Sequence, residues 1–587
     1  MDWWQPDRSW RAGEWTLRLR GDELADIAFA GRPVLRSIRA VARDHDWNTA
    51  DLVVDGIGED AGALTLQVRA SGAVTGLSGT VRVAASGRTL TVELDLAVAA
   101  DLDTNRTGLV VLHPAHLAGA RLRVRHADGS HEDTRFPAAI SPHQPVFDIT
   151  ALSWHAAGLG VGATFTGDVF EMEDQRNWTD GSYKTYVRPL ALPWPYRVAK
   201  GEPFRQSVTV TVEAAADAAP AAGASGAVTM QLLPTNRRFP EIGVGLRPEC
   251  LAQELSALDI LKTIGARHLI AHFDPDAGHG LSALQGYAQV AERSGLRVTL
   301  ELAVPCKRPL DEEMAGFAAL VRAAGLDLDT LFVCPSVDRQ STPPGSAWPD
   351  CPPLEDVYAA ARAAFPGVRL GGGMMSYFTE LNRKRVPGGL VDYVSHCTNP
   401  IVHAADDLSV MQTFEALRFV VSSARAIYGE KPYRIGPSTI AMRQNPYGSA
   451  TKDNPSGARI PMANVDPRHN GQFGAAWTLA YAATVASAGL EVLTLSTLAG
   501  PFGLVAGEGE ATAEGNMRPL GHVLARLGAL AGEPVLSVET SRPDAVVGLA
   551  SPERLLLANI TPEPQAVALP AGKEITLPPY GWVEIVL

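Results

Sequence analysis

Cysteine is scarce in this sequence, and its few copies are not arranged in pairs. The 587 residues include five cysteines, all between Cys250 and Cys397, and none of them forms a CxxC spacing. An odd number of dispersed cysteines argues against both a disulfide framework and a zinc knuckle. Because this usage is typical of a reducing compartment, we expect a cytoplasmic protein.

Export signals and long apolar runs are also missing. The first residues, MDWWQPDRSWRAGEW, place acids, Trp and Arg where a secretory peptide needs a basic start and then an apolar segment. No uninterrupted apolar stretch reaches the roughly 18 to 20 residues of a membrane-spanning helix. The sequence therefore predicts a soluble chain.

Basic residues are fewer than acidic residues. The chain has 51 Lys and Arg against 64 Asp and Glu, a formal net charge of -13. Nucleic acids and anionic membranes are bound through basic surface, so this composition argues against both partners. A small neutral ligand is the simpler expectation, and the sequence does not indicate an oligomeric state.

Several familiar catalytic motifs are absent. The sequence has no GxSxG elbow, no HExxH and no Gly-rich phosphate loop. His272 and Asp274 could bind a metal, but the stronger multi-histidine spacings are missing, so we predict no metal and no cofactor. Cys306, Cys334 and Cys397 lie near predicted strand ends; a thiolate nucleophile stays open there, although a small buried cysteine is the more common explanation.

The pattern of apolar residues changes along the chain and predicts a multidomain protein with α/β and all-β parts. In residues 1–213, runs such as TLTVELDLAV alternate apolar and polar residues and predict a β-sandwich. An Ala/Gly/Pro stretch within 214–235 reads as a linker. Residues 236–531 contain eight strand and helix units, which predict a (β/α)8 TIM barrel. Residues 532–587 return to strands and predict a small C-terminal β-domain.

Polar side chains are expected inside the barrel, near the C-terminal ends of its strands, where barrel enzymes place their chemistry. Alternation along the second strand directs His268, His272 and Asp274 inward, and along the third strand it directs Thr299 and Glu301 inward. His272, Asp274 and Glu301 should therefore converge. The alternative is a hydrogen-bonded polar layer that only fills the barrel.

The loops after later strands add further candidates. The stretch after strand seven has no obvious helix until Gln472, and structureless segments of that length are usually binding loops or lids. For His396 and His403 taken singly, a purely structural role is an alternative. For Arg383 and Arg385 the alternative is a solvated helix face. The substrate-binding candidates from these loops are Asn382, His396, Asn399, His403 and Arg443, and Glu380 is a candidate acid.

The stretch FEMEDQRNWTDGSY, residues 170–183, is the densest polar segment of the chain. Sugar hydroxyls can pair with acids and amides, and a Trp can cover an apolar sugar face. We therefore predict substrate contacts here; the alternative is a salt-bridged interface between domains. The candidates are Glu173, Asp174, Arg176, Asn177 and Trp178.

The longer run FEMEDQRNWTDGSYKTYVRPLALPWPY, together with SYFTELNRKR and NPIVHAADD, resembles the D-apionate lactonase family over the whole chain. The resemblance implies a hydrolase that opens D-apionolactone to D-apionate in carbohydrate catabolism. It also implies a β-rich N-terminal domain, a central barrel and a C-terminal β-domain. It carries no catalytic residues over to this chain, and the substrate of this member stays open.

Opening a lactone requires an activated water or a nucleophile, an oxyanion donor and an acid for the ring oxygen. We expect Glu301 as general base or nucleophile and Glu380 as the acid, with His272 as oxyanion donor or proton relay and Asp274 orienting it. A carboxylate pair also suits a glycoside hydrolase. Against this alternative, strands four and seven end in FVCPS and IGPS, without the Glu that common barrel glycosidases place there. A non-catalytic carbohydrate-binding protein is the third possibility.

Overall fold

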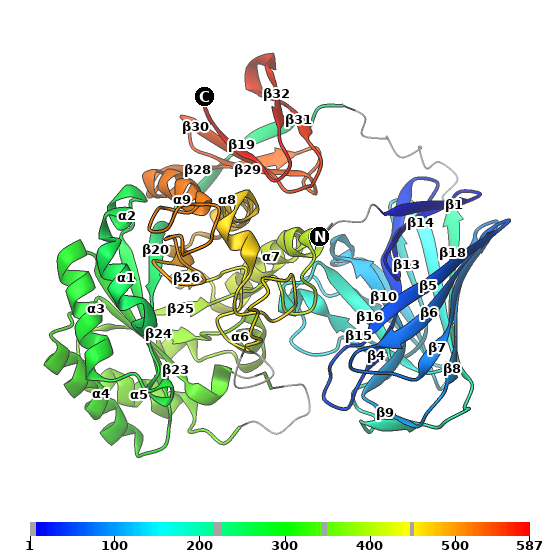
Figure 1. Cartoon of the computed structure of the whole chain (residues 1–587), viewed down its shortest axis with the longest axis horizontal. Helices are drawn as coiled ribbons and strands as arrows, with labels where there is room; N and C mark the ends of the chain where they lie inside the picture. Colours follow the sequence, from blue (N-terminus) through cyan, green and yellow to red (C-terminus); the bar gives the residue numbers. More distant parts are fainter. Residues whose placement is uncertain (1–6, 215–225, 340, 343–348, 446–450) are drawn as a thin grey trace. The chain divides into compact units, whose positions relative to one another are not determined.

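The computed structural model describes residues 7–214, 226–339, 341–342, 349–445 and 451–587 (Figure 1). The chain forms two compact units. The first comprises Met1–Arg176 and Gly181–Ser225, and the second comprises Asn177–Asp180 and Gly226–Leu587. The four residues Asn177–Asp180 thus belong with the barrel, although they come from the polar segment that the sequence singles out.

The first unit is built from antiparallel strands. Its main sheet runs in the order β1-β2-β3-β4-β10-β16-β15-β13-β14-β18-β8-β7-β6-β5, with β11 and β12 attached through β13, and β17 pairs with β9 separately. The strands are β1 (Arg8–Ala12), β2 (Trp15–Arg20), β3 (Glu23–Phe29), β4 (Arg32–Arg43), β5 (Asp51–Asp60), β6 (Ala63–Ser71), β7 (Leu77–Ser86), β8 (Thr89–Val98), β9 (Leu102–Thr104), β10 (Arg106–Pro114), β11 (Arg121–His126), β12 (His131–Arg135), β13 (Val146–Ala156), β14 (Leu159–Thr166), β15 (Phe170–Asp174), β16 (Ser182–Val187), β17 (Tyr196–Val198) and β18 (Phe204–Ala214).

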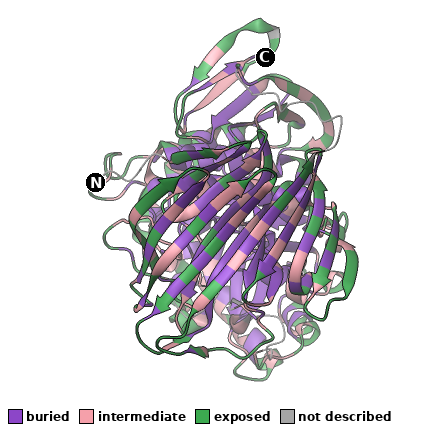
Figure 2. Cartoon of the chain, turned by 90° about the vertical axis from the view of Figure 1, so that its right-hand side faces the viewer, coloured by how far each residue is buried: buried purple, intermediate pink, exposed green. Residues whose placement is uncertain are grey.

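Both ends of this sheet contribute to a single core. Strand residues alternate between buried and exposed, most regularly in β8, because every second side chain faces the interior (Figure 2). Trp15 of β2 and Val83 of β7 belong to the same hydrophobic cluster, and the indole nitrogen of Trp15 donates to the carbonyl of Gly87 at 3.2 Å. The sheet therefore folds over on itself and encloses its core as a β-sandwich does.

The second unit contains a closed barrel of parallel strands, and helices follow the strands along the chain. The eight strands are β20 (Glu241–Leu246), β21 (His268–Phe273), β22 (Arg297–Val304), β23 (Thr330–Pro335), β24 (Arg369–Gly373), β25 (Tyr393–His396), β26 (Tyr433–Ile435) and β27 (Val492–Thr497). The described helices are α1 (Leu251–Ser256), α2 (Leu258–Thr263), α3 (Leu281–Ser294), α4 (Leu310–Ala324), α5 (Leu354–Ala364), α6 (Phe378–Lys384), α7 (Asp407–Tyr428), α8 (Gln472–Val485) and α9 (Pro519–Ala529).

Local sequence explains where these elements begin and end. Helix α4 starts after Pro309, carries three acids in its first turn that complement the positive end of the helix dipole, and stops at Gly325, whose φ of 66° suits glycine. Strand β22 is buried from its second residue onward, because its two faces pack against helices and against the barrel interior. The predicted TIM barrel is confirmed.

A smaller antiparallel sheet follows the barrel, in the order β19-β28-β29-β30-β33, and a separate ribbon pairs β31 with β32. Strand β19 lies partly within the predicted linker, whose residues 215–225 are outside the described part of the chain. It becomes a strand because β28 offers it an antiparallel partner. The strands are β19 (Met230–Arg238), β28 (Pro534–Thr540), β29 (Val546–Ala550), β30 (Arg554–Asn559), β31 (Gln565–Ala568), β32 (Glu574–Leu577) and β33 (Trp582–Val586).

The three-part architecture expected from the sequence is present: an all-β N-terminal region, a parallel barrel and a C-terminal β-sheet. Among the described residues, no helix is long and apolar enough to cross a membrane.

Candidate active site

Three side chains meet inside the barrel mouth. Strands β21 and β22 pair in register at His272 and Glu301, and the Nδ1 of His272 lies 2.7 Å from the Oε2 of Glu301. Arg443, from the loop after β26, donates from Nη2 to the same oxygen, also at 2.7 Å. The alternation of the two strands predicts the convergence of His272 and Glu301, and the fold adds Arg443.

The electrostatics of Glu301 keep it ionised. Burial by itself would raise the pKa of this carboxyl, but the positive charge of Arg443 and the hydrogen bond from His272 outweigh burial and lower the pKa to about 2. A carboxylate this acidic is a poor proton acceptor at neutral pH. Glu301 is therefore better suited to orienting His272 than to acting as a base itself.

The state of His272 follows from that of its neighbour. An ionised carboxylate can only accept hydrogen bonds, so Nδ1 of His272 carries a proton, and Nε2 is the ring nitrogen that does not face Glu301. The imidazole side chain is 21% exposed, whereas Glu301 is 3% exposed. Tyr287 of α3 donates its hydroxyl to the backbone carbonyl of His272 at 2.6 Å and fixes the strand end. Sequence reasoning missed Tyr287, because nothing local in α3 marks it.

Asp274 shapes the turn after β21. Its Oδ1 accepts from the backbone nitrogen of Asp276 at 3.0 Å and caps the short helix at Pro275–Ala277. Its own backbone nitrogen donates to Nδ1 of His279 at 3.0 Å. Glu301 contacts the His272 ring and Asp274 holds the loop after the strand, while the expected orienting role of Asp274 stays a prediction.

A narrow cavity lies beside Arg443. Its volume of about 10 Å³ is the space of roughly one water molecule. Two polar atoms on its wall, Ser376 Oγ and Gln444 Oε1, are buried and have no hydrogen-bond partner among the residues that the structure describes. Unpaired buried polar atoms are costly, so they mark a place where a ligand group can bond. In the sequence, Ser376 and Gln444 are marked only by their positions after barrel strands.

The other cavity residues form its frame. Burial raises the pKa of the Cys397 thiol to about 12, so it is a neutral thiol beside Arg443 rather than a nucleophile. Asn399 bonds the backbone of residues 401 and 439–441 with both ends of its amide. His396, whose pKa burial lowers to about 4, bonds Tyr433 and the carbonyl of Cys397. The polar groups of both side chains thus have partners within the protein, and substrate contact by His396 and Asn399 stays a prediction.

Glu380 lies on helix α6 next to this wall. Its Oε1 accepts from Thr342 N at 3.2 Å and from Arg383 at 3.0 Å. Burial raises the pKa of Glu380 in spite of the nearby Arg383 and Lys384. Glu380 is not among the residues that line the cavity, and its role as the acid stays a prediction.

The residues Asn177–Asp180 pack against helix α6 and the loop after β25. Asn382 donates from Nδ2 to Asn177 Oδ1 at 3.1 Å, and His403 Nδ1 lies 2.6 Å from Asp180 Oδ2. The ring of Trp178 lies 6.1 Å from that of Tyr377, which lines the cavity, and 5.9 Å from that of His403. Trp178 is buried, and substrate contact by Asn177, Trp178, Asn382 and His403 stays a prediction.

The remaining polar residues of this segment belong to the first unit. Arg176 forms a two-point ion pair with Asp174, at 2.8 Å and 2.7 Å, and donates to the carbonyl of Pro137 at 2.7 Å. Asp174 also accepts from Ser141 N at 2.9 Å, and Glu173 pairs with Lys184. These contacts favour the salt-bridged alternative for Glu173, Asp174 and Arg176, and their binding of substrate stays a prediction.

The polar layer considered as an alternative exists as well, closer to the N-terminal ends of the strands. Thr299 bonds His268 and lies 2.6 Å from Thr330, and Arg434 donates to Thr299 and Thr330 at 3.2 Å and 3.1 Å. The barrel interior therefore has a structural polar layer below and the His272 cluster above it. Within the described ranges, no three His, Cys, Asp or Glu side chains are grouped so that they could hold a metal ion.

Comparison with known proteins identifies the family. Residues 2–215 match the N-terminal domain of D-apionate lactonase, residues 242–532 its TIM barrel domain, and residues 543–585 its C-terminal immunoglobulin-like domain. The chain belongs to the D-apionate lactonase family. A D-apionate lactonase from Brucella anthropi is 50% identical over 580 residues, which cover 97% of this chain and 95% of the relative. The family places this chain among lactone-hydrolysing enzymes, and the resemblance noted in the sequence is confirmed.

Solved structures resemble this lactonase-family chain only weakly. A family 51 α-L-arabinofuranosidase from Bifidobacterium longum has a TM-score of 0.44 at 12% identity, covering 61% of this chain and 99% of the other. A GH30 endoxylanase from Clostridium papyrosolvens C71 has a TM-score of 0.37 at 10% identity, covering 62% and 99%. Likenesses of this size carry no argument about function.

Proposed function

We propose that this protein hydrolyses D-apionolactone, or a closely related aldonolactone, to the sugar acid, with His272 as the general base. The observation that carries the proposal is the Glu301, His272 and Arg443 cluster at the barrel mouth. Family membership supports a lactone as the substrate, and the name of the Brucella relative, D-apionate lactonase, supports D-apionate as the product.

In the proposed reaction, Nε2 of His272 takes a proton from a water molecule, and the resulting hydroxide attacks the lactone carbonyl. Glu301 holds the imidazole through Nδ1 and stabilises the positive charge that His272 gains. The proton on His272 then passes to the departing ring oxygen, so one imidazole serves as base and then as acid. This scheme needs no second carboxylate and differs from our expectation that Glu301 is the base and Glu380 the acid.

Arg443 is the group we assign to the developing oxyanion. It lines the cavity and carries a permanent positive charge beside the His272 and Glu301 pair. A charge that is already in position stabilises the tetrahedral intermediate without reorganisation. The hydrogen bonds that Arg443 donates to Pro437 O at 3.3 Å and to Glu301 at 2.7 Å keep its guanidinium in one orientation.

The narrow cavity suits one small polar group of the substrate rather than the whole ring. We propose that a sugar hydroxyl enters it, accepts from Ser376 Oγ and donates to Gln444 Oε1, because both atoms otherwise lack a partner in the described chain.

A pH-stat assay tests the proposed function directly. We expect acid release from D-apionolactone, and slower release from other γ-lactones of aldonic acids, above the spontaneous rate measured without protein. A panel of nitrophenyl glycosides covers the glycoside hydrolase alternative. Glycoside cleavage without lactone opening, or lactone binding by calorimetry without any acid release, would overturn the proposal in favour of one of its two alternatives.

Removing the Ser376 hydroxyl should weaken substrate binding. We expect Ser376→Ala to raise KM about two- to tenfold with little change in kcat, the scale of one uncharged hydrogen bond made equally in ground and transition states. Steady-state kinetics on the lactone measure both constants. Ser422→Ala is the matched control, because Ser422 is exposed on α7. An unchanged KM for Ser376→Ala would remove this residue from the substrate site.

A further inference from the structure

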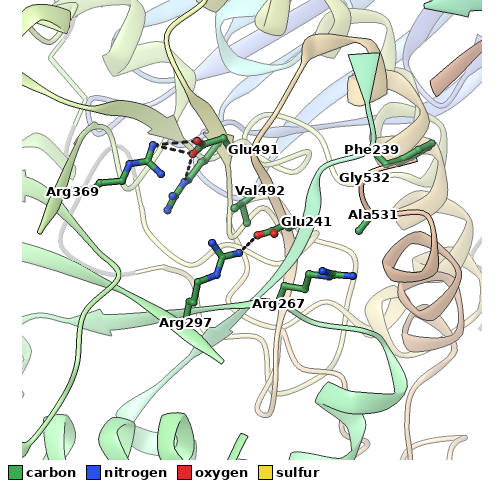
Figure 3. Close-up of a pocket in the computed structure, with 10 residues that line it drawn as sticks. Phe239, Glu241, Arg267, Arg297, Arg369, Glu491, Val492, Ala531 and Gly532 are labelled. Atoms are coloured by element: carbon green, nitrogen blue, oxygen red, sulfur yellow. Dashed lines mark hydrogen bonds and ion pairs between the residues drawn. The ribbon is translucent and has the colours of Figure 1, made fainter. Parts of the chain in front are cut away.

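A second cavity, of about 310 Å³, lies at the opposite end of the barrel (Figure 3). Its charged lining comes from the first residues of barrel strands or from residues just before them, so it is separate from the His272 cluster at the C-terminal ends. The charged residues are Glu241, Arg267, Arg297, Arg369, Arg434 and Glu491.

Positive charge exceeds negative charge in this lining, because four guanidinium groups face two carboxylates. Glu491 is shared between Arg369 and Arg434, each at 3.1 Å, and Glu241 pairs with Arg297. Arg267 makes no ion pair with any residue that the structure describes, and its side chain is exposed at the cavity (Figure 3). The cavity therefore has an uncompensated excess of two positive charges.

The geometry holds part of this excess in place. Arg434 is buried, donates to Thr299 and Thr330, and lies 4.0 Å from the centre of the Tyr393 ring. Burial, and then the charges of Arg434, Arg297 and Arg369, lower the pKa of His268 to about 3. His268 therefore adds no positive charge to those of the arginines. Fixed arginines facing a solvent-filled cavity are the usual means of binding oxyanions.

We propose that this cavity binds an oxyanion with two negative charges, of the phosphate class, in contact with Arg267, Arg297 and Arg369. Two charges balance the excess of the lining, and a tetrahedral oxyanion offers enough acceptors for several arginine forks. A monocarboxylate, which is the product of the proposed reaction, carries only one charge and matches the cavity less well. The site is thus distinct from the site of lactone hydrolysis.

Isothermal titration calorimetry with inorganic phosphate on the full-length protein tests this site, at constant ionic strength set with chloride. We expect saturable binding that chloride alone does not produce, and a Kd at least about tenfold weaker for Arg267→Gln and for Arg297→Gln, the scale of one charge-assisted hydrogen bond. Arg293→Gln, at an exposed position on α3 outside the cavity, is the control and should bind as the wild type does.

Parallel titrations with sulfate and with a small sugar phosphate distinguish the two possible occupants. Tighter binding of sulfate indicates a free oxyanion, and tighter binding of the sugar phosphate indicates a phosphorylated metabolite. Both results agree with the proposal. Folding of each variant is checked by its melting temperature without phosphate. The proposal fails if wild-type protein shows no saturable phosphate binding, or if folded Arg267→Gln and Arg297→Gln proteins both bind phosphate as tightly as the wild type.

Discussion

Replacing His272 with asparagine is expected to lower kcat for lactone hydrolysis by about 100- to 10,000-fold, the contribution of a positioned general base. The fold should survive, because His272 is partly exposed and asparagine can still donate to Glu301. Binding of the substrate should persist, since the cavity groups at Ser376 and Gln444 are untouched. Steady-state kinetics and melting temperatures measured together check both expectations.

A matched control is His279→Asn. The His279 ring lies 5.9 Å from the His272 ring but bonds Glu249 and the backbone of Asp274 instead of Glu301. We expect this variant to retain most of the wild-type kcat. Near wild-type turnover by folded His272→Asn protein would remove His272 as the base and return Glu301 to that role.

The pH dependence of the rate separates the same two roles. With a pKa of about 2, Glu301 stays ionised throughout the range from pH 5 to 9 and cannot produce a change of rate there. A change of rate within that range would therefore have to come from a group other than Glu301. An acid limb confined to values below about pH 4 would instead indicate a carboxylate base.

The stability linked to Glu301 is lost on acidification. Its pKa is lowered on folding from an ordinary value of 4.5 to about 2, so its contribution to the free energy of unfolding is complete above the ordinary value. That contribution is lost as the pH falls from there towards 2. Acid unfolding of the barrel unit should therefore be steeper in wild-type protein than in a Glu301→Gln variant.

Arg176→Ala is expected to cost about 3 to 5 kcal/mol of unfolding free energy, the scale for stranding one partner of a buried ion pair. Its partner Asp174 and its own side chain are both fully buried, and Arg176 also lies 4.4 Å from the centre of the Tyr183 ring. Protein that remains folded should hydrolyse lactone with unchanged kcat and KM, because the pair bonds Pro137 and Ser141 of the sandwich. Denaturant unfolding and kinetics on the same preparation measure the two quantities.

The sandwich offers a close control for this substitution. Arg123 and Asp133 form an ion pair with the same two-point geometry, at 2.7 Å and 2.8 Å, but their side chains are 60% and 72% exposed. Arg123→Ala should therefore change stability far less than Arg176→Ala. A loss of turnover in folded Arg176→Ala protein with little loss of stability would restore the substrate-binding interpretation.

Some features of this protein could be predicted from the sequence because they depend on local periodicity. Alternating apolar residues indicate the strands of the sandwich, and the repeated strand and helix units indicate the barrel. The same alternation directs His272 and Glu301 to one face of neighbouring strands, where the structure finds them in contact. Strand β19 could not be predicted from the sequence, because its pairing partner β28 lies some 300 residues later along the chain.

By itself, the sequence determined the family, the order of domains and the inward-facing pair His272 and Glu301, since each depends on residues close together along the chain. Only the tertiary structure decided the roles of the polar residues. It placed Arg443 against Glu301, buried the Asp174 and Arg176 pair inside the sandwich, and used every polar group of Asn399 to hold a loop. Charge, burial and hydrogen-bond partners come from residues far apart in sequence, so a local pattern cannot distinguish a ligand contact from an internal ion pair.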